Sequence, residues 1–295
     1  MEANEEERIP QGELIYYSFK LNPAFKELYY LVISDAHYGN PLFSQHHFIR
    51  TLEFLKKPNA YGFLNGDLCE STLRTSKGEI YKQVGSPEDQ RDQIIEWLMP
   101  YRNKLLGIID GNHEERIWKE AGIHICKDIA KALSIPFDPE GMLLKISFGD
   151  KNKRMEGKPF VFWHYTQHGY GGARTKSGKA VKVERMGTWV HADLYTMSHD
   201  HVVNAAPDVY LMQDPRTRPQ LDKHSKPTGF IIGKVKAHTK KLVKTNAYLK
   251  WGGYAEMYGF PPVDLETPMI RLLTPYSKHW EELPEKPKQA VKVEV

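Results

Sequence analysis

Five short blocks of acidic, amide and imidazole side chains stand out in this chain of 295 residues. They are Asp35-Ala36-His37, Gly66-Asp67, Gly111-Asn112-His113-Glu114, His168-Gly169 and His199-Asp200-His201. Each block follows an apolar run that reads as a strand, and ligand sites in α/β sheets gather at the carboxyl ends of strands. We therefore expect the five blocks to meet in space, although they are far apart in the sequence.

The residue types in these blocks suit a pair of divalent metal ions. Carboxylate and imidazole groups bind Mn, Zn or Fe, and none of the blocks offers a thiolate. One carboxylate can bridge two ions, and two ions about 3.5–4 Å apart can hold a hydroxide and clamp a phosphoryl group. A free histidine beside a ligand can protonate the leaving oxygen. The blocks therefore favour a pair of bound divalent metal ions, an arrangement that can act on a phosphoryl group.

Alternating strands and helices must position the first three blocks. Apolar runs predict strands at Glu27 to Ser34, Ala60 to Leu64 and Leu105 to Ile109. Helical periodicity predicts helices from Gln45 to Lys57, from Ser86 onward with Pro87 at its first position, and through Ile117, Ala121, Ile125, Ile129 and Leu133. This alternation is typical of βαβ units around a parallel sheet.

The second half of the chain favours strands. They are predicted at Leu143 to Phe148, Phe160 to Gln167, Ala192 to Met197, Val209 to Met212, Phe230 to Ile232, Ala247 to Trp251 and Met269 to Leu273. The chain has no internal repeat and no clean linker, so we expect one domain over residues 14–283. A polar extension, residues 1–13, precedes it, and a solvated tail, residues 284–295, follows it.

The order of the blocks resembles the calcineurin-like metallophosphoesterase superfamily, whose pattern is D-x-H, G-D, G-N-H-[DE], H and G-H-x-H. The stretch from Gly171 to Lys179 also resembles loops of phage-type members. The resemblance implies an α/β fold, a four-layer αββα sandwich of two mixed sheets flanked by helices. It also implies two divalent metal ions, Mn²⁺ before Zn²⁺, Fe or Ni.

The resemblance assigns roles to individual residues. Seven would hold metal: Asp35, His37 and His201 on one ion, Asn112, His168 and His199 on the other, and Asp67 between the two. His113 would be the proton donor, and Glu70, three residues after Asp67, would orient it.

Two positions depart from a simple match. Ser198 stands where the family usually has glycine before H-x-H. The fourth block offers both His164 and His168, and we favour His168 because the glycines that follow it let backbone approach a metal or a phosphate.

A basic stretch runs from Gly169 to Met186 and contains Arg174, Lys176 and Lys179. One interpretation is an anion clamp over the phosphate of a substrate or over a nucleic-acid backbone. The other is a solvated basic loop followed by a helix. We take these three cations as candidate substrate-binding residues.

Composition narrows the class of protein. Apolar residues are 40% and charged residues 26%, which excludes collagen, coiled coil and whole-chain disorder, and the net charge of +4 does not by itself require nucleic acid. No apolar stretch approaches the ~20 residues of a membrane span. The N-terminus lacks a signal sequence and only two cysteines occur, so we expect a cytoplasmic protein.

The expected function is that of a dinuclear phosphodiesterase acting on nucleotides or nucleic acid through a metal-bridging hydroxide. A phosphomonoesterase, including a protein phosphatase, is the alternative within this class. A non-catalytic nucleic-acid-binding module on the same fold is the alternative outside it. The oligomeric state is left open.

Overall fold

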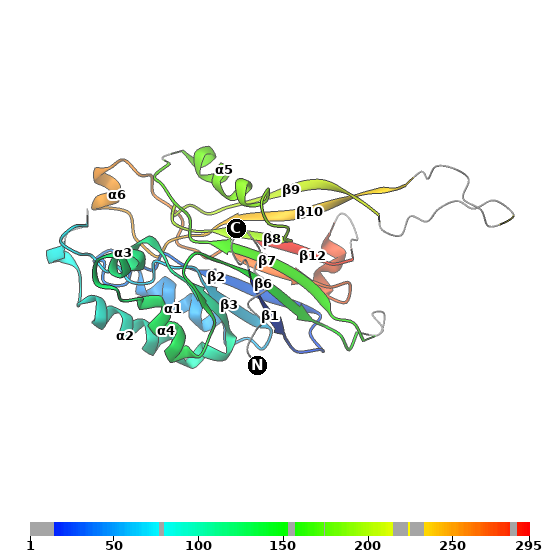
Figure 1. Ribbon diagram of the computed structural model, residues 1–295, viewed down its shortest axis with the longest axis horizontal. Coiled ribbons are helices and arrows are strands. Elements are labelled where there is room, and N and C mark those ends of the chain that lie inside the picture. Colours follow the sequence, from blue (N-terminus) through cyan, green and yellow to red (C-terminus); the bar gives the residue numbers. More distant parts are fainter. Residues whose placement is uncertain are drawn as a thin grey trace, which may run out of the picture.

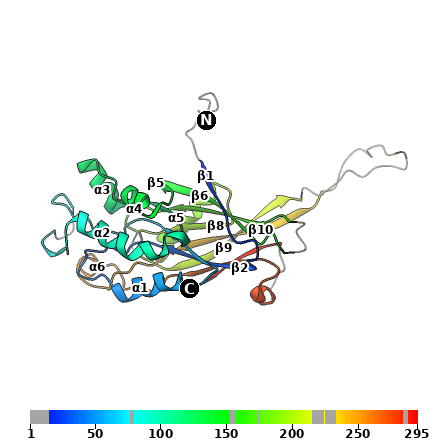
Figure 2. The same cartoon turned by 90° about the horizontal axis from the view of Figure 1, so that it is seen from below.

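Two six-stranded mixed β-sheets lie face to face in the computed structural model, and helices cover both outer faces (Figures 1 and 2). The structure describes residues 15–76, 80–152, 157–173, 175–214, 224, 233–283 and 288–295. The expected four-layer sandwich is therefore confirmed. No helix in these ranges is long and apolar enough to cross a membrane.

One sheet has the strand order β12-β11-β2-β3-β4-β5. Its strands are β2 (Glu27–Ile33), β3 (Ala60–Leu64), β4 (Leu105–Ile109), β5 (Phe137–Asp138), β11 (Met269–Leu273) and β12 (Ala290–Glu294). Strands β2 to β5 run parallel, while β11 and β12 are antiparallel to their neighbours. Because parallel strands end at the same edge, the three blocks that follow β2, β3 and β4 emerge side by side.

Helices cover the outer face of this sheet. They are α1 (Gln45–Phe54), α2 (Pro87–Leu98), α3 (Asn112–Ala121) and α4 (Ile125–Leu133), with the 3₁₀ turns η2 (Ile80–Lys82) and η3 (Met99–Lys104). The start of α2 follows the predicted signal, because the Ser86 hydroxyl accepts from the Asp89 N–H and the Ser86 N–H donates to the Asp89 carboxylate. Apolar side chains of α1, α2 and α4 pack against the sheet.

The helix predicted to run through Ile117 and Leu133 is in fact two helices. Gly122 ends α3 in a left-handed conformation with φ of 68°, and its N–H bonds to the Trp118 carbonyl. Glycine adopts this conformation without steric cost, which makes it a common helix terminator. The continuous apolar spacing had hidden this break. The separation leaves α3 free to lie at the edge where the strands end, while α4 packs on the sheet.

The second sheet has the order β1-β6-β7-β8-β10-β9. Its strands are β1 (Tyr16–Lys20), β6 (Gly141–Phe148), β7 (Phe160–Gln167), β8 (Leu194–Met197), β9 (Asn204–Gln213) and β10 (Val235–Lys244). Its inner face shares one apolar core with the first sheet, and its outer face packs against α5 (Lys176–Met186). The short elements α6 (Tyr254–Met257) and η5 (Lys278–Glu282) complete the fold.

Several predictions in the second half are wrong. Strand β10 was missed because lysines interrupt its pattern, yet Lys240 is buried in an ion pair with Asp208 of β9. Residues 247–251 form no strand. This segment instead lies against the loop after β2, where the Tyr248 N–H donates to the Asp35 carbonyl. The tail expected to be solvated contains β12, which pairs with β11. The strand predicted at 230–232 and the extension 1–13 lie outside the described residues.

His164 is a buried histidine of the core between the strands. Its Nδ1 lies 3.0 Å from the Tyr30 hydroxyl and its Nε2 lies 2.8 Å from the Thr196 hydroxyl. Burial lowers the pKa of His164 from 6.5 to about 3, so the folded protein holds this imidazole neutral.

This gives a pH dependence of stability. The unfolded imidazole gains a proton near pH 6.5, whereas the folded one gains it only near pH 3, so acidification through that window favours unfolding. We expect His164 to add up to ~1.4 kcal/mol per pH unit to the slope of unfolding free energy. His164→Gln, which stays neutral, should flatten that slope in urea titrations between these pH values. Parallel curves for the two proteins would contradict the assignment.

Candidate metal centre

The ligand-bearing turns share an unusual backbone. Five of the predicted metal ligands adopt positive φ: Asp35 at 48°, His37 at 49°, Asp67 at 51°, His199 at 68° and His201 at 51°. This left-handed region is uncommon for residues other than glycine and costs of order 1–3 kcal/mol each when the surroundings must enforce it. Such strain clusters at functional sites, and here it turns each side chain inward from the end of a strand.

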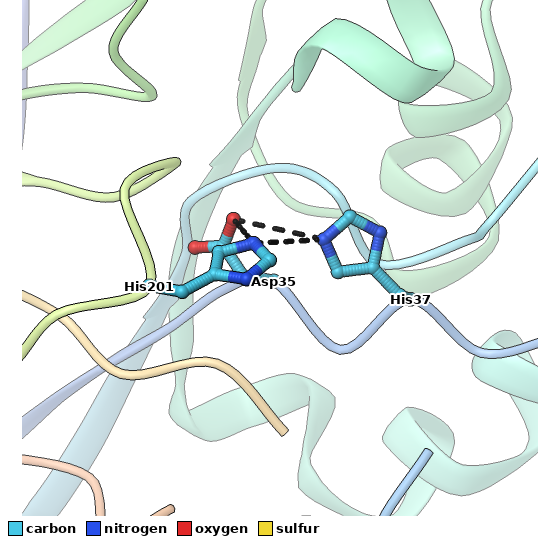
Figure 3. A group of neighbouring side chains, drawn as sticks. All are labelled: Asp35, His37 and His201. Atoms are coloured by element: carbon cyan, nitrogen blue, oxygen red, sulfur yellow. Dashed lines mark hydrogen bonds and ion pairs between the residues drawn. The ribbon is translucent and has the colours of Figure 1, made fainter. Parts of the chain in front are cut away.

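Asp35, His37 and His201 form the first ligand group (Figure 3). The Nε2 atoms of His37 and His201 are 3.1 Å apart, and His201 Nε2 lies 3.2 Å from Asp35 Oδ1. Two imidazole nitrogens that face each other cannot both carry a proton, but both can offer a lone pair to one cation. Burial opposes ionisation of Asp35, but its hydrogen bond with His201 and the nearby imidazoles lower its pKa to about 2.

A second ligand group contains Asp67, His168 and His199, together with the Asn112 amide oxygen. His168 Nε2 is 3.1 Å from Asp67 Oδ2 and 3.3 Å from Asn112 Oδ1. His199 Nδ1 is 2.7 Å from the same Asn112 oxygen. Asp67 Oδ2 also lies 3.8 Å from His37 Nε2, which places this carboxylate between the two groups.

The donor set fits divalent cations. Carboxylate, amide oxygen and imidazole are ligands of Zn, Mn and Fe, and the buried Cys69 thiol is in neither group. Burial opposes protonation of His37 and His168, yet the neighbouring carboxylates raise their pKa values to about 9 and about 10. Two imidazoles that attract protons so strongly mark an excess of negative potential, which a cation would also satisfy.

Backbone carbonyls orient two of the ligand imidazoles. His168 Nδ1 donates to the Asn65 carbonyl at 2.7 Å, and His199 Nε2 donates to the Gly171 carbonyl at 2.7 Å. In each ring the remaining nitrogen faces the ligand group, where a bound cation would take the place of a proton and accept the lone pair. His164, the alternative in the fourth block, points into the core and takes no part.

Two glycines allow the second and third blocks to touch. A Cβ on Gly66 would lie 2.4 Å from the Gly111 nitrogen, and a Cβ on Gly111 would lie 2.1 Å from Asp67 Oδ1. The Glu114 carboxylate joins the same loops, since it accepts from the N–H groups of Asp67 and Leu68 at 2.9 and 2.8 Å, of Cys69 at 3.0 Å and of Gly111 at 3.2 Å. Our sequence analysis gave Glu114 no role, because only the folded loops bring these donors together.

Glu70 acts on a different histidine from the one expected. Its carboxylate Oε2 is 3.2 Å from His37 Nδ1 but 3.9 Å from His113 Nδ1. His113 Nδ1 instead donates to the Glu70 backbone carbonyl at 2.6 Å. Glu70 thus orients His113 through its main chain, while its carboxylate is free to hold the ligand His37.

His113 lies at the start of α3, at the edge of both ligand groups. Its side chain is 18% exposed and its Nε2 is 4.0 Å from Asp67 Oδ2. Burial lowers the pKa of His113 to about 4, opposed by Asp67 and reinforced by the charges of His37 and Arg116. Nε2 of the neutral ring therefore carries a lone pair and faces Asp67, while Nδ1 keeps the proton.

The basic stretch from Gly169 to Met186 is largely helical, since α5 begins at Lys176. Lys179 is only 3% exposed, and its Nζ donates to the Asp200 carbonyl at 2.8 Å, so its predicted contact with substrate is wrong. Lys176 is exposed at the first position of the helix. Arg174 lies outside the described residues.

Arg116 is a cation at the site that sequence reasoning missed. It lies one helical turn after Asn112 on α3, and its Nε donates to the Asn112 carbonyl at 3.2 Å. No carboxylate among the described residues pairs with its guanidinium group. The signal was present, since residues four apart share a helix face once His113 is placed on a helix.

Ser198 proves compatible with the turn before His199. It is fully buried, and its hydroxyl is 2.5 Å from Asn65 Nδ2 and 2.9 Å from the Thr245 hydroxyl. The serine therefore ties the fifth block to loops that follow β3 and β10, rather than loosening it.

Comparison with known proteins adds little to this geometry. No protein-family model matches the chain, and no curated protein matches its sequence. Among solved structures, it is similar to a conserved uncharacterized protein from Streptococcus pneumoniae TIGR4 described as a predicted phosphoesterase. The similarity covers 84% of each chain at 12% sequence identity, with a TM-score of 0.33. At that level it carries no argument about activity, which depends on the side chains described above.

The two contacts of Glu70 can be separated by experiment. Glu70→Gln removes the charge beside His37 but keeps the carbonyl that orients His113. We expect affinity for Mn²⁺ to fall about 10-fold in calorimetric titration, the effect typical of a lost ligand-orienting carboxylate. Unchanged affinity for Mn²⁺ with a lower kcat would contradict this assignment. It would indicate that the Glu70 carboxylate acts on His113 and not on His37.

Proposed function

We propose that this protein is a phosphoesterase that uses two divalent metal ions, with Mn²⁺ as the first candidate. The observation that supports this most directly is the position of Asp67. Its carboxylate lies 3.1 Å from His168 in one ligand group and 3.8 Å from His37 in the other, as a bridging ligand must. Asp35, His37 and His201 would hold one ion, and Asn112, His168 and His199 the other.

Two bound ions would act as Lewis acids toward a phosphoryl group and lower the pKa of a bound water. The chain itself supplies orientation and proton transfer. Asn112 brings an amide to the ligand groups, where its nitrogen can also donate to a phosphoryl oxygen. His113, held by the Glu70 carbonyl, can exchange a proton at Nε2 with the leaving oxygen. Negative charge on a bound phosphate would raise the pKa of His113 and favour its proton-donating form.

We favour phosphodiesters, with nucleotides or nucleic acid as the substrate class. Arg116 and Lys176 offer cationic side chains for a phosphate and its extended backbone, and the metal groups are compatible with either ester. A phosphomonoesterase and a non-catalytic nucleic-acid-binding module are the alternatives that the experiment below distinguishes.

Hydrolysis of bis-nitrophenyl phosphate and of nitrophenyl phosphate tests the proposal. After chelation both activities should be absent, and added Mn²⁺ should restore diester turnover. His113→Ala should lower kcat by roughly 10²–10⁴-fold, the usual contribution of a general acid. Its metal affinity should stay near that of the parent protein, because His113 belongs to neither of the two proposed ligand groups. A loss of affinity would instead assign an ion to the third possible group, His37, Asp67 and His113.

The remaining outcomes each exclude a part of the proposal. Turnover of the monoester alone would exclude the phosphodiesterase preference. Metal binding without turnover of either ester, or of single-stranded DNA, would favour the binding module. Failure to bind metal would exclude the metal-dependent mechanism altogether.

Arg116→Gln tests the phosphate contact. A hydrogen bond to a charged group contributes about 1.5–3 kcal/mol, so KM for the diester should rise roughly 10-fold or more while kcat changes less. Lys119→Gln is the matched control, because Lys119 lies on the same helix but pairs with Glu115 at the surface. Equal KM values for the two variants would exclude Arg116 from substrate binding.

A further inference from the structure

Asp200 lies between two metal ligands, yet its side chain points away from them into the protein. It is only 7% exposed. Its Oδ1 accepts from Lys182 Nζ at 2.7 Å, and its Oδ2 accepts from Lys244 Nζ at 2.6 Å. One buried carboxylate therefore bridges two ammonium groups, one from α5 and one from β10.

Lys244 and a third lysine, Lys179, also bind the backbone of the loop that carries His199 and His201. Lys244 Nζ donates to the Ser198 carbonyl at 2.8 Å, and Lys179 Nζ donates to the Asp200 carbonyl at 2.8 Å. Lys182 Nζ donates to the Tyr170 carbonyl at 2.6 Å, which fixes the neighbouring loop where Gly171 accepts from His199. Side chain and main chain of residues 198–200 are thus held by three cations.

This arrangement is not explained by stability alone. Lys244 is 1% exposed and Lys179 is 3% exposed, so both ammonium groups lose most of their hydration. The Asp200 carboxylate binds two of these three lysines and its carbonyl binds the third, and burying charge in this way often stabilises a fold less than apolar packing would. The network instead constrains the backbone of this loop. Two residues of the loop, His199 and His201, adopt the left-handed conformation.

We propose that Asp200, Lys182 and Lys244 are positioning residues that hold His199 and His201 in their left-handed conformations and thereby set metal affinity in both ligand groups. The inference rests on the proposed metal-dependent function. His199 belongs to one ligand group and His201 to the other, so a single peptide segment controls both. Release of Asp200 would let the segment relax and its ring nitrogens turn away from Asn112 and Asp35.

Charge alone could also link these residues to the metals, and its effect has a different sign. Removing the Asp200 charge would weaken cation binding, but removing the Lys244 charge would strengthen it. Loss of positioning weakens binding in both cases. The two single variants Asp200→Asn and Lys244→Met, together with the double variant, therefore separate the two explanations.

The experiment is calorimetric titration of the chelated 295-residue protein with Co²⁺ and with Mn²⁺, together with the visible absorption of the Co²⁺ form. Both single variants should bind at least about 10-fold more weakly, and the double variant should not recover. The Co²⁺ bands should shift, since they report ligand geometry. Asp208→Asn is the control. It removes the ion-pair partner of the buried Lys240 between β9 and β10 and contacts none of the proposed metal ligands. The metal affinity of this variant should equal that of the parent protein.

Other results overturn the inference. Tighter metal binding by Lys244→Met, or parental affinity in the double variant, would exclude positioning. The electrostatic effect of the two charges on the metal ions would then explain the results. Parental affinity in all variants would exclude any role of Asp200 and Lys244 in metal binding. The proposed phosphoesterase function would be unaffected by that result. If the parent protein bound neither metal, the proposed function itself would fail. Lys182→Met replaces Lys244→Met if circular dichroism shows that the latter does not fold, and the same outcomes apply.

Discussion

The close approach of the loops after β3 and β4 is the constraint on which the rest of the site depends. Gly66 and Gly111 lie too near each other for any side chain, and the Glu114 carboxylate accepts from three backbone N–H groups across the gap and from that of Gly111 on its own side. The His113 N–H donates to Asp67 Oδ1 at 2.8 Å and closes the contact. Because of this junction, Asp67 lies between two ligand groups and His113 lies at their edge.

Around that junction, three of the four candidate ligand imidazoles are held through their other nitrogen. Glu70 faces His37, the Asn65 carbonyl accepts from His168, and the Gly171 carbonyl accepts from His199. Orientation by a carbonyl or carboxylate selects which nitrogen offers its lone pair. The candidate site therefore consists of the side chains that would bind metal and a second set of groups that orient them. Most of the orienting groups are backbone carbonyls, so the residue types alone do not reveal them.

The two sheets contribute differently to this centre. Parallel strands β2, β3 and β4 deliver three blocks to one edge by topology alone. The second sheet must bring His168 and the segment 198–201 to the same edge, and it uses buried polar contacts to do so. Ser198 bonds to Asn65 and Thr245, while Asp200 bonds to lysines of α5 and β10. The first sheet therefore places its blocks through strand topology, whereas the second sheet places its blocks through hydrogen bonds and ion pairs between residues far apart in the sequence.

The sequence by itself determined the elements whose information is local. Strands β2, β3, β4, β7 and β11 follow dense apolar runs, and the start of α2 follows its capping residues, so these could be predicted. The ordered blocks also indicated which side chains would converge, because a shared strand edge is a topological consequence. The break at Gly122 was missed because continuous apolar spacing runs across it, while β10 and β12 were missed because paired lysines and strand addition depend on distant partners.

Only the tertiary structure decided how the converging residues work. It separated the Glu70 carboxylate from His113, buried Lys179, and placed Arg116 beside Asn112 and His113 at the edge of the two ligand groups. It also imposed left-handed backbone on five of the candidate metal ligands, which no residue pattern specifies. The physical reason is that hydrogen-bond partners, burial and backbone strain are properties of the assembled chain, whereas periodicity and residue type describe each segment alone.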